Sequence, residues 1–301
     1  MTLWSRDRRC PTSKMAPLVL ELQRRPEIES LCCVTAQHRE MLDSVMQTFG
    51  IKADFDLDIM VPGQTLSDIT SRALKGLEKV FNATKPDIVL VHGDTSTTFA
   101  AALAAFYAQI SVGHVEAGLR THDKYFPFPE EINRKLVGSI ADLHFCPTAR
   151  NAENLRKEGV SKGIFITGNT VIDAMRYTVR KENYFTDKRL EKLDYSSEKV
   201  ILMTCHRREN YGRPMENIFT AVNDIVKAFP DIKVVYPVHP SPAVKETAYR
   251  ILGDTPQVLL TEPLDTAEMH TLMSRCYLVL TDSGGLQEEA PALVKPVLVL
   301  R

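Results

Sequence analysis

Short β-branched runs alternate with helix-like segments along nearly all of the 301 residues, and this alternation constrains the fold most. Strand–helix–strand order predicts parallel sheets with crossover helices, in doubly wound α/β domains. The expected strands are 30–35, 55–61, 87–92, 110–116, 143–146, 163–167, 200–204, 233–238, 258–260, 277–281 and 297–300. The expected helices are 15–25, 38–49, 65–81, 97–107, 130–140, 150–158, 170–180, 216–228, 242–252, 267–274 and one after Gly285.

A polar stretch from Lys181 to Lys199 interrupts this rhythm. It has few aliphatic side chains, as segments between domains often do. We therefore expect two doubly wound domains, residues 1–180 and residues 181–301, that face each other across a cleft.

The two ends do not fit this pattern. A doubly wound domain normally opens with a strand, but the residues before Met15 are polar and irregular. The chain stops at Arg301, on an apolar strand that no helix follows, although a buried parallel strand needs helices on both faces of its sheet. The sequence therefore predicts a first and a last domain that are both incomplete.

Composition excludes several classes of partner. The net charge of −1 provides no basic field for nucleic acid or anionic lipid. No apolar stretch approaches the 18 or so residues of a membrane span, and the N-terminus lacks the apolar core of a secretory signal. The six cysteines form no Cys-x-x-Cys pair or Cys/His cluster with metal spacing, which favours reduced thiols in a cytoplasmic protein without a metal.

Acidic residues follow strands in the first half of the chain. Asp94 comes just after the strand that ends at His92, Glu116 follows the next strand, and Glu130 and Glu131 open a helix. Ligands of open parallel sheets bind at the carboxyl ends of strands. We therefore expect Asp94, Glu116 and one of the two adjacent glutamates to converge on one cleft.

Structural roles are open for each of these acids. Asp94 is also a suitable helix N-cap, and Glu130 or Glu131 also complements a helix dipole. A carboxylate at the end of a buried strand needs a partner, and Arg120 is the nearest candidate for Glu116. His92 and His114, which lie inside apolar strands, are expected as hydrogen-bonded core histidines.

Cationic residues follow a strand in the second half. His206, Arg207 and Arg208 come directly after the strand that ends at Thr204, which predicts an anion site suited to a diphosphate. A solvated run of charges is the alternative. His239 follows another strand end and is as well explained by a structural role.

A Ser-Gly-Gly sequence, Ser283 to Gly285, lies between a strand and a helix. Free N–H groups at such a helix start suit phosphate, and Glu289 in the following turns suits ribose hydroxyls. No Gly-x-Gly-x-x-Gly, phosphate-loop or Gly-x-Ser-x-Gly sequence is present, so no dinucleotide cofactor or ATP is expected. Acids in one half and cations in the other fit a nucleotide-sugar.

Several motifs resemble those of the non-hydrolysing UDP-N-acetylglucosamine 2-epimerases. The resemblance runs in order from Lys14 to Arg301 without a large gap. The matching strings are Lys14-Met-Ala-Pro-Leu18, Val91-His-Gly-Asp-Thr95, His114-Val-Glu-Ala-Gly-Leu-Arg-Thr121, Pro129-Glu-Glu-Ile-Asn-Arg134, Ile166-Thr-Gly-Asn-Thr-Val-Ile-Asp173, His206-Arg-Arg-Glu-Asn210 and Thr281-Asp-Ser-Gly-Gly-Leu-Gln-Glu-Glu-Ala-Pro291.

The resemblance implies two Rossmann-like domains of the glycosyltransferase-B type, a homodimer, no cofactor, and interconversion of UDP-N-acetylglucosamine with UDP-N-acetylmannosamine. By similarity the catalytic residues are Asp94, Glu116, Glu130 and His206. The implied substrate-binding residues are Lys14, Arg207, Ser283, Gly284, Gly285 and Glu289. Gln37 and His38 match an allosteric site of some bacterial relatives, but Glu40 and Gly63 replace its usual Gln and Arg, so full allosteric control is not expected.

Three other functions remain open at this point. A glycosyltransferase of the same architecture shares the nucleotide site but does not need three acids. A hydrolysing epimerase releases free N-acetylmannosamine, and the His206–Asn210 string argues against it. A UDP-sugar-binding protein or inactive fragment binds UDP without turnover.

Overall fold

The computed structural model describes residues 2–4, 11–35, 39–180 and 184–300, so Gln37 and His38 lie outside the described residues. Its contacts divide the chain into two compact units, residues 1–174 and 175–301. The division falls inside helix α7 (Thr170–Thr178). Each unit is described by itself.

The first unit is built on a seven-stranded sheet in the order β3-β2-β1-β4-β5-β6-β7, with every neighbouring pair parallel. The strands are β1 (Thr2–Trp4), β2 (Cys32–Val34), β3 (Phe55–Asp56), β4 (Ile88–His92), β5 (Ser111–Val115), β6 (Leu143–Cys146) and β7 (Ile164–Ile166). Its helices before α7 are α1 (Pro11–Gln23), α2 (Arg39–Phe49), α3 (Leu66–Thr84), α4 (Ser96–Tyr107), α5 (Glu130–Ile140) and α6 (Ala149–Lys157).

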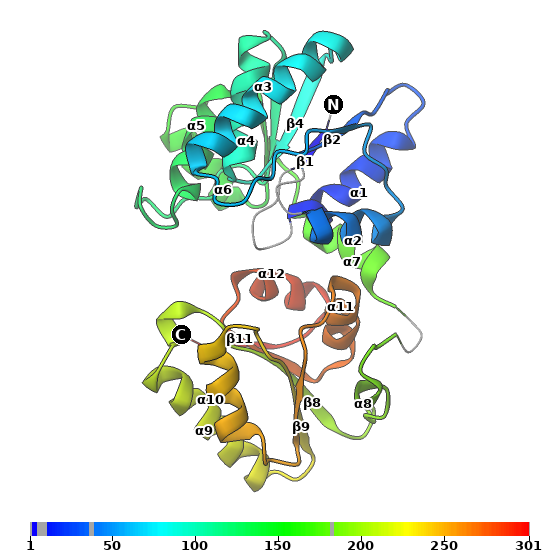
Figure 1. Cartoon of the computed structure of the whole chain (residues 1–301), viewed down its shortest axis with the longest axis vertical. Helices are drawn as coiled ribbons and strands as arrows, with labels where there is room; N and C mark the ends of the chain where they lie inside the picture. Colours follow the sequence, from blue (N-terminus) through cyan, green and yellow to red (C-terminus); the bar gives the residue numbers. More distant parts are fainter. Residues whose placement is uncertain (1, 5–10, 36–38, 181–183, 301) are drawn as a thin grey trace. The chain divides into compact units, whose positions relative to one another are not determined.

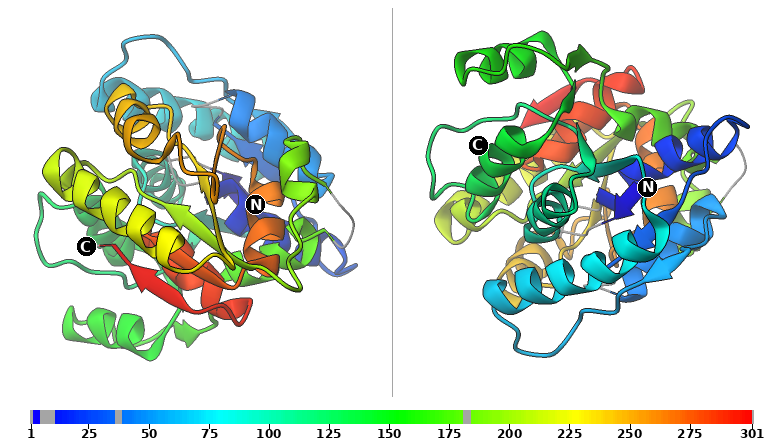
Figure 2. Two further views of the ribbon diagram at one scale, coloured as in Figure 1. Left: turned by 90° about the horizontal axis from the view of Figure 1, so that it is seen from below. Right: turned by 90° about the horizontal axis from the view of Figure 1, so that it is seen from above.

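Helices cover the sheet because their apolar stripes pack on its strands. Leu77 and Phe81 of α3 and several alanines of α4 pack with Val89 and Val91 of β4. Small alanine side chains let α4 lie close to both its sheet and α3. The helices α1 and α2 lie side by side, as the blue ribbons of Figures 1 and 2 show.

Two expectations for the first unit are wrong. The residues before Met15 do contain a strand, because Thr2–Trp4 pairs with β2 on one side and β4 on the other. Three residues are too few to show a side-chain period, and the backbone of the neighbouring strands supplies the pairing. The strand expected over 55–61 covers only Phe55–Asp56, and Asp58 has a positive φ of 44° that ends extended backbone.

The second unit holds a five-stranded parallel sheet in the order β10-β9-β8-β11-β12. The strands are β8 (Lys199–Thr204), β9 (Ile232–Pro237), β10 (Val258–Thr261), β11 (Leu278–Thr281) and β12 (Val297–Val299). The helices are α8 (Lys188–Glu191), α9 (Arg213–Ala228), α10 (Pro242–Leu252), α11 (Thr266–Arg275) and α12 (Gly284–Ala292), with a 3₁₀ turn at Arg208–Asn210.

Alternate residues of β8 separate the two faces of this sheet. Ile201 and Met203 pack under α9 and α10, whereas Val200 and Leu202 pack under α11 and α12. Figure 1 shows α9 and α10 together on one side of the strands. Phe185 and Leu190, from the polar stretch 181–199, are buried in the second of these cores. The predicted doubly wound architecture is therefore confirmed in each unit.

Strand order places the functional edge of each sheet. In both orders the connections reverse direction beside the first strand of the unit, between β1 and β4 and between β8 and β11. Ligands of open α/β sheets bind at the carboxyl ends of strands at such a switch point. The ends of β4, β8 and β11 carry Asp94, His206 and Ser283, which the sequence analysis selected without the strand order.

Candidate active site

Glu116 lies directly after β5 and forms an ion pair with Lys14 of α1. Its backbone has a positive φ of 63°, which is uncommon for a residue with a side chain and costs energy unless its surroundings hold it. Burial by itself would raise the pKa of Glu116, but opposing effects, of which the charge of the Lys14 ammonium is the largest, hold that pKa below its usual range. Glu116 is therefore an ionised carboxylate in a buried setting.

The loop after Glu116 is fixed by tight backbone contacts. Gly118 has a φ of 84°, and a Cβ atom there would lie 2.2 Å from the backbone oxygen of Asn151, so only glycine fits. Arg120 donates to both carboxylate oxygens of Glu158, at 2.7 and 2.6 Å. The alternative pairing of Arg120 with Glu116 is therefore wrong, because Arg120 pairs with Glu158, the C-cap residue of α6, and Glu116 pairs with Lys14.

Asp94 is tied to the first turns of α5. The Asp94 carboxylate pairs with the Arg134 guanidinium, and the Asn133 side-chain amide donates to the Asp94 backbone oxygen at 2.9 Å. Asp94 is not the N-cap of α4, because Thr95 has that position and accepts from the backbone N–H of Thr98. These contacts bring Asp94 next to the helix that begins at Glu130.

The two adjacent glutamates at the start of α5 have different environments. Glu131 is 0% exposed and accepts hydrogen bonds from the backbone N–H groups of Thr121 and His122, both at 3.1 Å. It also forms an ion pair with Arg134, at 3.3 Å. Glu131 therefore holds the 119–126 loop in place, which leaves Glu130 as the candidate acid of this pair.

The two strand histidines differ from each other, and only His114 fits the expectation. His114 Nε2 lies 2.8 Å from the backbone oxygen of Gly93, as a core histidine should. Neither ring nitrogen of His92 has a hydrogen-bond partner among the described residues, and its Nε2 atom lies 3.5 Å from Glu116 Oε2. His92 is thus part of the Glu116 environment.

In the second unit, the buried carboxylate of Asp282 organises the loop after β8. Its Oδ2 atom accepts from the backbone N–H groups of His206 and Arg207, both at 2.8 Å, and from the Asn210 side-chain amide at 3.0 Å. Its Oδ1 atom lies 3.2 Å from His206 Nδ1. The β8 and β11 ends are thereby locked together, with the His206 ring held from one side.

The other face of the His206 ring stacks on His239, with ring centroids 5.5 Å apart and planes 11° apart. His239 follows β9, so three neighbouring strand ends contribute to this cluster of the second unit. Arg207 lies beside the start of α12, where a Cβ atom added to Gly284 would be 3.5 Å from Arg207 Nη2. The guanidinium and the helix start thus face the same region.

Helix α12 begins without a side-chain cap. Ser283 is its N-cap residue, but the Ser283 hydroxyl accepts no hydrogen bond from the helix. The N–H groups of its first turn therefore have no capping side chain, which is the arrangement that binds phosphate at helix starts. One turn further on, the Glu289 carboxylate lies close over Gly285, where an added Cβ would be 3.6 Å from Glu289 Oε1.

Glu289 is held from behind by a buried histidine. His270 of α11 lies with its Nε2 atom 3.4 Å from Glu289 Oε2. The Nδ1 atom of the same ring is 2.6 Å from the hydroxyl of Thr178, the last residue of α7. This chain of contacts sets the position of Glu289 over the start of α12.

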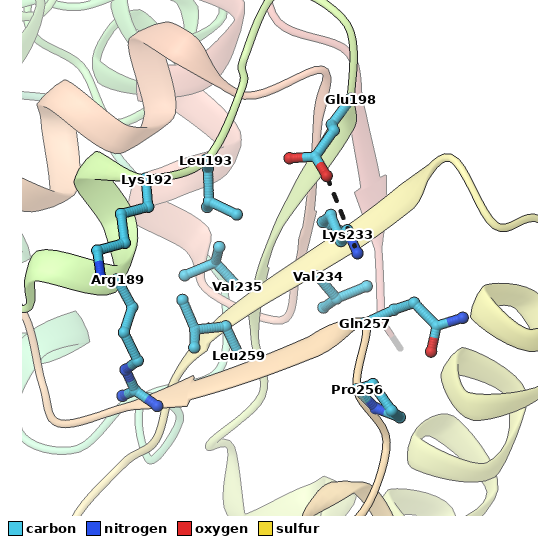
Figure 3. A pocket seen from close by; sticks show the side chains of 10 residues that line it. All are labelled: Arg189, Lys192, Leu193, Glu198, Lys233, Val234, Val235, Pro256, Gln257 and Leu259. Atoms are coloured by element: carbon cyan, nitrogen blue, oxygen red, sulfur yellow. Dashed lines mark ion pairs between the residues drawn. The ribbon is translucent and has the colours of Figure 1, made fainter.

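A pocket of about 290 Å³ lies at the other edge of the second sheet (Figure 3). Lys233 at the start of β9 and Glu198 just before β8 line it, 3.9 Å apart, above the side chains of Val235 and Leu259. This edge carries the amino ends of the strands, where α/β sheets do not bind ligands. Among the described residues, no group of three or more His, Cys, Asp or Glu side chains has an arrangement that could hold a metal ion.

Sequence reasoning missed the residues that support the candidates. Asp282, Arg134 and His270 hold His206, Asp94 and Glu289, respectively. Asp282 carried a detectable signal, because a carboxylate that follows a buried strand needs a partner, as argued for Glu116. Arg134 and His270 gave no such signal, because their partners come from elements far away in the sequence.

Comparisons with known proteins match these features. The sequence profile of the family described as UDP-N-acetylglucosamine 2-epimerase matches residues 20–301. The UDP-N-acetylglucosamine 2-epimerase of Bacillus subtilis (strain 168) is 57% identical over 289 residues, which cover 96% of this chain and 75% of that protein. The chain belongs to the UDP-N-acetylglucosamine 2-epimerase family. The resemblance found in the motifs is therefore confirmed.

Solved structures of the family agree in fold. The UDP-N-acetylglucosamine 2-epimerase of Neisseria meningitidis, bound to UDP-N-acetylglucosamine, is 46% identical with a TM-score of 0.87 and covers 100% of this chain and 82% of its own. An S. aureus structure with UDP is 51% identical, also has a TM-score of 0.87, and covers 100% of this chain and 78% of its own. The glycosyltransferase-B type of fold implied by the motifs is thus the fold of the family.

Proposed function

We propose that this chain interconverts UDP-N-acetylglucosamine and UDP-N-acetylmannosamine by reversible inversion at C2 of the sugar. The observation that carries the proposal is the 57% identity over 96% of the chain to an enzyme of this name. The pairing of Lys14 with a buried, ionised Glu116 supports it, because the reaction needs a carboxylate base.

The reaction requires elimination before proton transfer. The C2 proton is not acidified by a neighbouring carbonyl, so its direct removal is slow. When the C1–O bond breaks, its electron pair leaves with the β-phosphate oxygen of UDP and C1 becomes oxocarbenium-like. A carboxylate then takes the C2 proton, and the C2–H electrons form the C1–C2 double bond of a glycal. Protonation of C2 on the opposite face and re-addition of the UDP oxygen at C1 complete the inversion.

We assign the acid–base work to the first unit. Asp94, Glu116 and Glu130 are the proposed catalytic carboxylates, and Lys14 is the proposed substrate-binding cation beside them. Glu116 is suited to be a base because Lys14 keeps it ionised. A second carboxylate is needed because the proton leaves C2 on one face of the sugar and returns on the other. The contacts of Asp94 with Arg134 and Asn133 support its place near Glu130.

We assign binding of UDP to the second unit. His206, Arg207, the Ser283 hydroxyl and the N–H groups at Gly284 and Gly285 would stabilise the charge that develops on the leaving diphosphate. Their preorganisation by Asp282 supports this role, because groups fixed before the reaction do not have to reorient during it. Glu289 would accept hydrogen bonds from the ribose hydroxyls.

We also propose that residues 1–180 and 181–301 act as the two functional domains, that the protein is a homodimer, and that it works in the cytoplasm without a cofactor. Among the helices in the described part of the chain, none combines the length and apolar character needed to cross a bilayer. Sedimentation at twice the chain mass would support the dimer, and sedimentation as a monomer would refute it.

Incubation with UDP-N-acetylglucosamine alone in deuterated water tests the function. We expect UDP-N-acetylmannosamine and deuterium at C2 of both nucleotide-sugars, followed by NMR. A glycosyltransferase would leave the sugar unchanged without an acceptor, and a hydrolysing epimerase would release UDP and free N-acetylmannosamine. Either result would refute the proposal, as would binding of UDP without exchange.

A matched variant links the activity to the first unit. Replacing Glu116 by Gln keeps the size of the side chain but removes the base, so exchange should fall by about 10³-fold or more. The binding of UDP, measured by calorimetry, should stay within a few-fold of wild type because UDP contacts belong to the second unit. Exchange at the wild-type rate in Glu116→Gln would refute the assignment of Glu116.

A further inference from the structure

His92 is buried without the hydrogen bonds that a buried imidazole needs. His92 is 6% exposed, and neither of its ring nitrogens has a hydrogen-bond partner among the described residues. A buried polar group without a partner destabilises the fold, so each example calls for a physical reason. An aromatic hydrocarbon ring would fill the same space without this cost. The reason must therefore lie in what the His92 nitrogens face.

The Nε2 atom of His92 faces one oxygen of Glu116. It lies 3.5 Å from Glu116 Oε2, while the other oxygen, Oε1, is occupied by the Lys14 ammonium. The next residue, Gly93, lies beside the same oxygen, because an added Cβ there would be in van der Waals contact with Glu116 Oε2, at 3.5 Å. The Oε2 atom therefore lies in a niche between the His92 ring and the Gly93 backbone.

The charge of the ring decides what it can do. Burial lowers the pKa of His92 to about 4, against the opposing effect of Glu116, so the ring is neutral at the pH at which such enzymes work. Among the described residues, the titratable groups that act electrostatically on Glu116 are Lys14 from α1, His92 from β4 and His114 from β5. Burial also lowers the pKa of His114 to about 3, so Lys14 is the cation and the two rings are neutral.

We propose that His92 is a positioning residue for the reaction, whose neutral ring donates its Nε2–H to Glu116 Oε2 when substrate binds. This inference rests on the proposed function of Glu116. A shift of the carboxylate by about 0.5 Å turns the observed separation into a hydrogen bond of ordinary length. With Lys14 on one oxygen and His92 on the other, the carboxylate has a single orientation toward C2, and small misplacements of a catalytic group are costly.

Three substitutions at one position test the proposal. In His92→Gln the side-chain amide places an N–H close to the position of Nε2, whereas in His92→Asn it lies near Nδ1, and His92→Phe has no donor. We expect kcat to fall about 10- to 100-fold in His92→Phe and His92→Asn, with KM little changed, because the lost bond is to a charged group. His92→Gln should retain kcat within a few-fold. His144→Phe, which replaces a buried histidine of β6, is the control for general loss of packing.

The titration of Glu116 gives a readout that does not depend on turnover. A donor stabilises the carboxylate, so its loss should raise the pKa of Glu116 by about one unit in His92→Phe and not in His92→Gln. Carbon-13 NMR of glutamate-labelled protein saturated with UDP-N-acetylglucosamine, with the Glu116 signal assigned by Glu116→Gln, measures this pKa in the state in which the bond is expected. A folded His92→Phe with wild-type kcat and an unchanged Glu116 titration would overturn the inference. Wild-type protein without exchange activity would overturn the proposed function instead, and the titration would still decide the role of His92.

Discussion

The Nδ1 atom of His206 lies 3.2 Å from the Oδ1 atom of Asp282, and the other oxygen of Asp282 accepts the backbone N–H of His206 itself. One fully buried carboxylate thus hydrogen-bonds the main chain of the proposed diphosphate-binding histidine and lies next to its ring. Because β8 and β11 are neighbours in the sheet, this contact holds across the switch point of the second unit.

Replacing Asp282 by Asn should damage both stability and activity. Three donors point at one oxygen of Asp282: the N–H groups of His206 and Arg207 and the Asn210 amide. In the variant they would meet either an amide N–H₂ group or a neutral, weaker acceptor. We therefore expect a loss of about 2–4 kcal/mol in the free energy of unfolding. We also expect kcat/KM to fall about 100-fold as His206 loses its fixed position. Urea unfolding and the exchange assay measure the two effects. A variant with normal kcat/KM would contradict the positioning role of Asp282.

Replacing Ser283 by Ala should affect binding without affecting stability. Since the Ser283 hydroxyl caps no N–H of α12, its loss should change the free energy of unfolding by less than about 0.5 kcal/mol. If the hydroxyl binds phosphate, KM should rise about tenfold. Thr65→Ala is the reciprocal control, because Thr65 does cap α3 and its loss should cost about 1 kcal/mol with no change in KM. An unchanged KM in Ser283→Ala would exclude the phosphate contact.

Replacing His270 by Phe should weaken nucleotide binding while leaving the chemical step intact. The substitution removes the nitrogen that lies 3.4 Å from Glu289, so the carboxylate becomes free to rotate away from the ribose. We expect the Kd of UDP to rise about five- to tenfold, because one polar contact is lost. The kcat value should stay within about twofold of wild type. Thr178→Val, which removes only the contact behind His270, should have a smaller effect. Calorimetry with UDP gives the Kd of each variant, and the exchange assay gives kcat. Equal Kd values in wild type and His270→Phe would refute this role.

The buried histidines should make the fold sensitive to acid well above the pKa of any carboxylate. Burial lowers the pKa of His92 to about 4 and of His114 to about 3, against a model-peptide value of 6.5 in the unfolded chain. Between pH 6.5 and 4 the unfolded chain therefore binds more protons, and stability falls as the pH falls through this window. Each histidine should contribute a slope of about 1.4 kcal/mol per pH unit.

Urea unfolding between pH 7 and pH 4.5 measures this slope. His114→Gln should flatten it by about 1.4 kcal/mol per pH unit, because glutamine does not titrate. An identical slope in His114→Gln and wild type would show that His114 does not titrate in the unfolding equilibrium as expected.

The sequence determined which groups are proposed for the site, because these groups follow strands that are recognisable by their own composition. Asp94, Glu116, His206 and Ser283 each come directly after an apolar run or within two residues of one, and parallel strands end at one edge of their sheet. The helical period likewise located α3 and most other helices to within a few residues. These inferences need only contacts between residues close along the chain.

Only the tertiary structure decided which groups face each other. It showed that Lys14 and not Arg120 pairs with Glu116, that Glu131 is occupied by backbone N–H groups, and that Thr2–Trp4 is a central strand. It also placed Asp282 under His206 and the unpaired ring of His92 beside Glu116. Such pairings depend on strand order and on the burial of groups that are distant in the sequence. A local pattern of residues predicts neither of these.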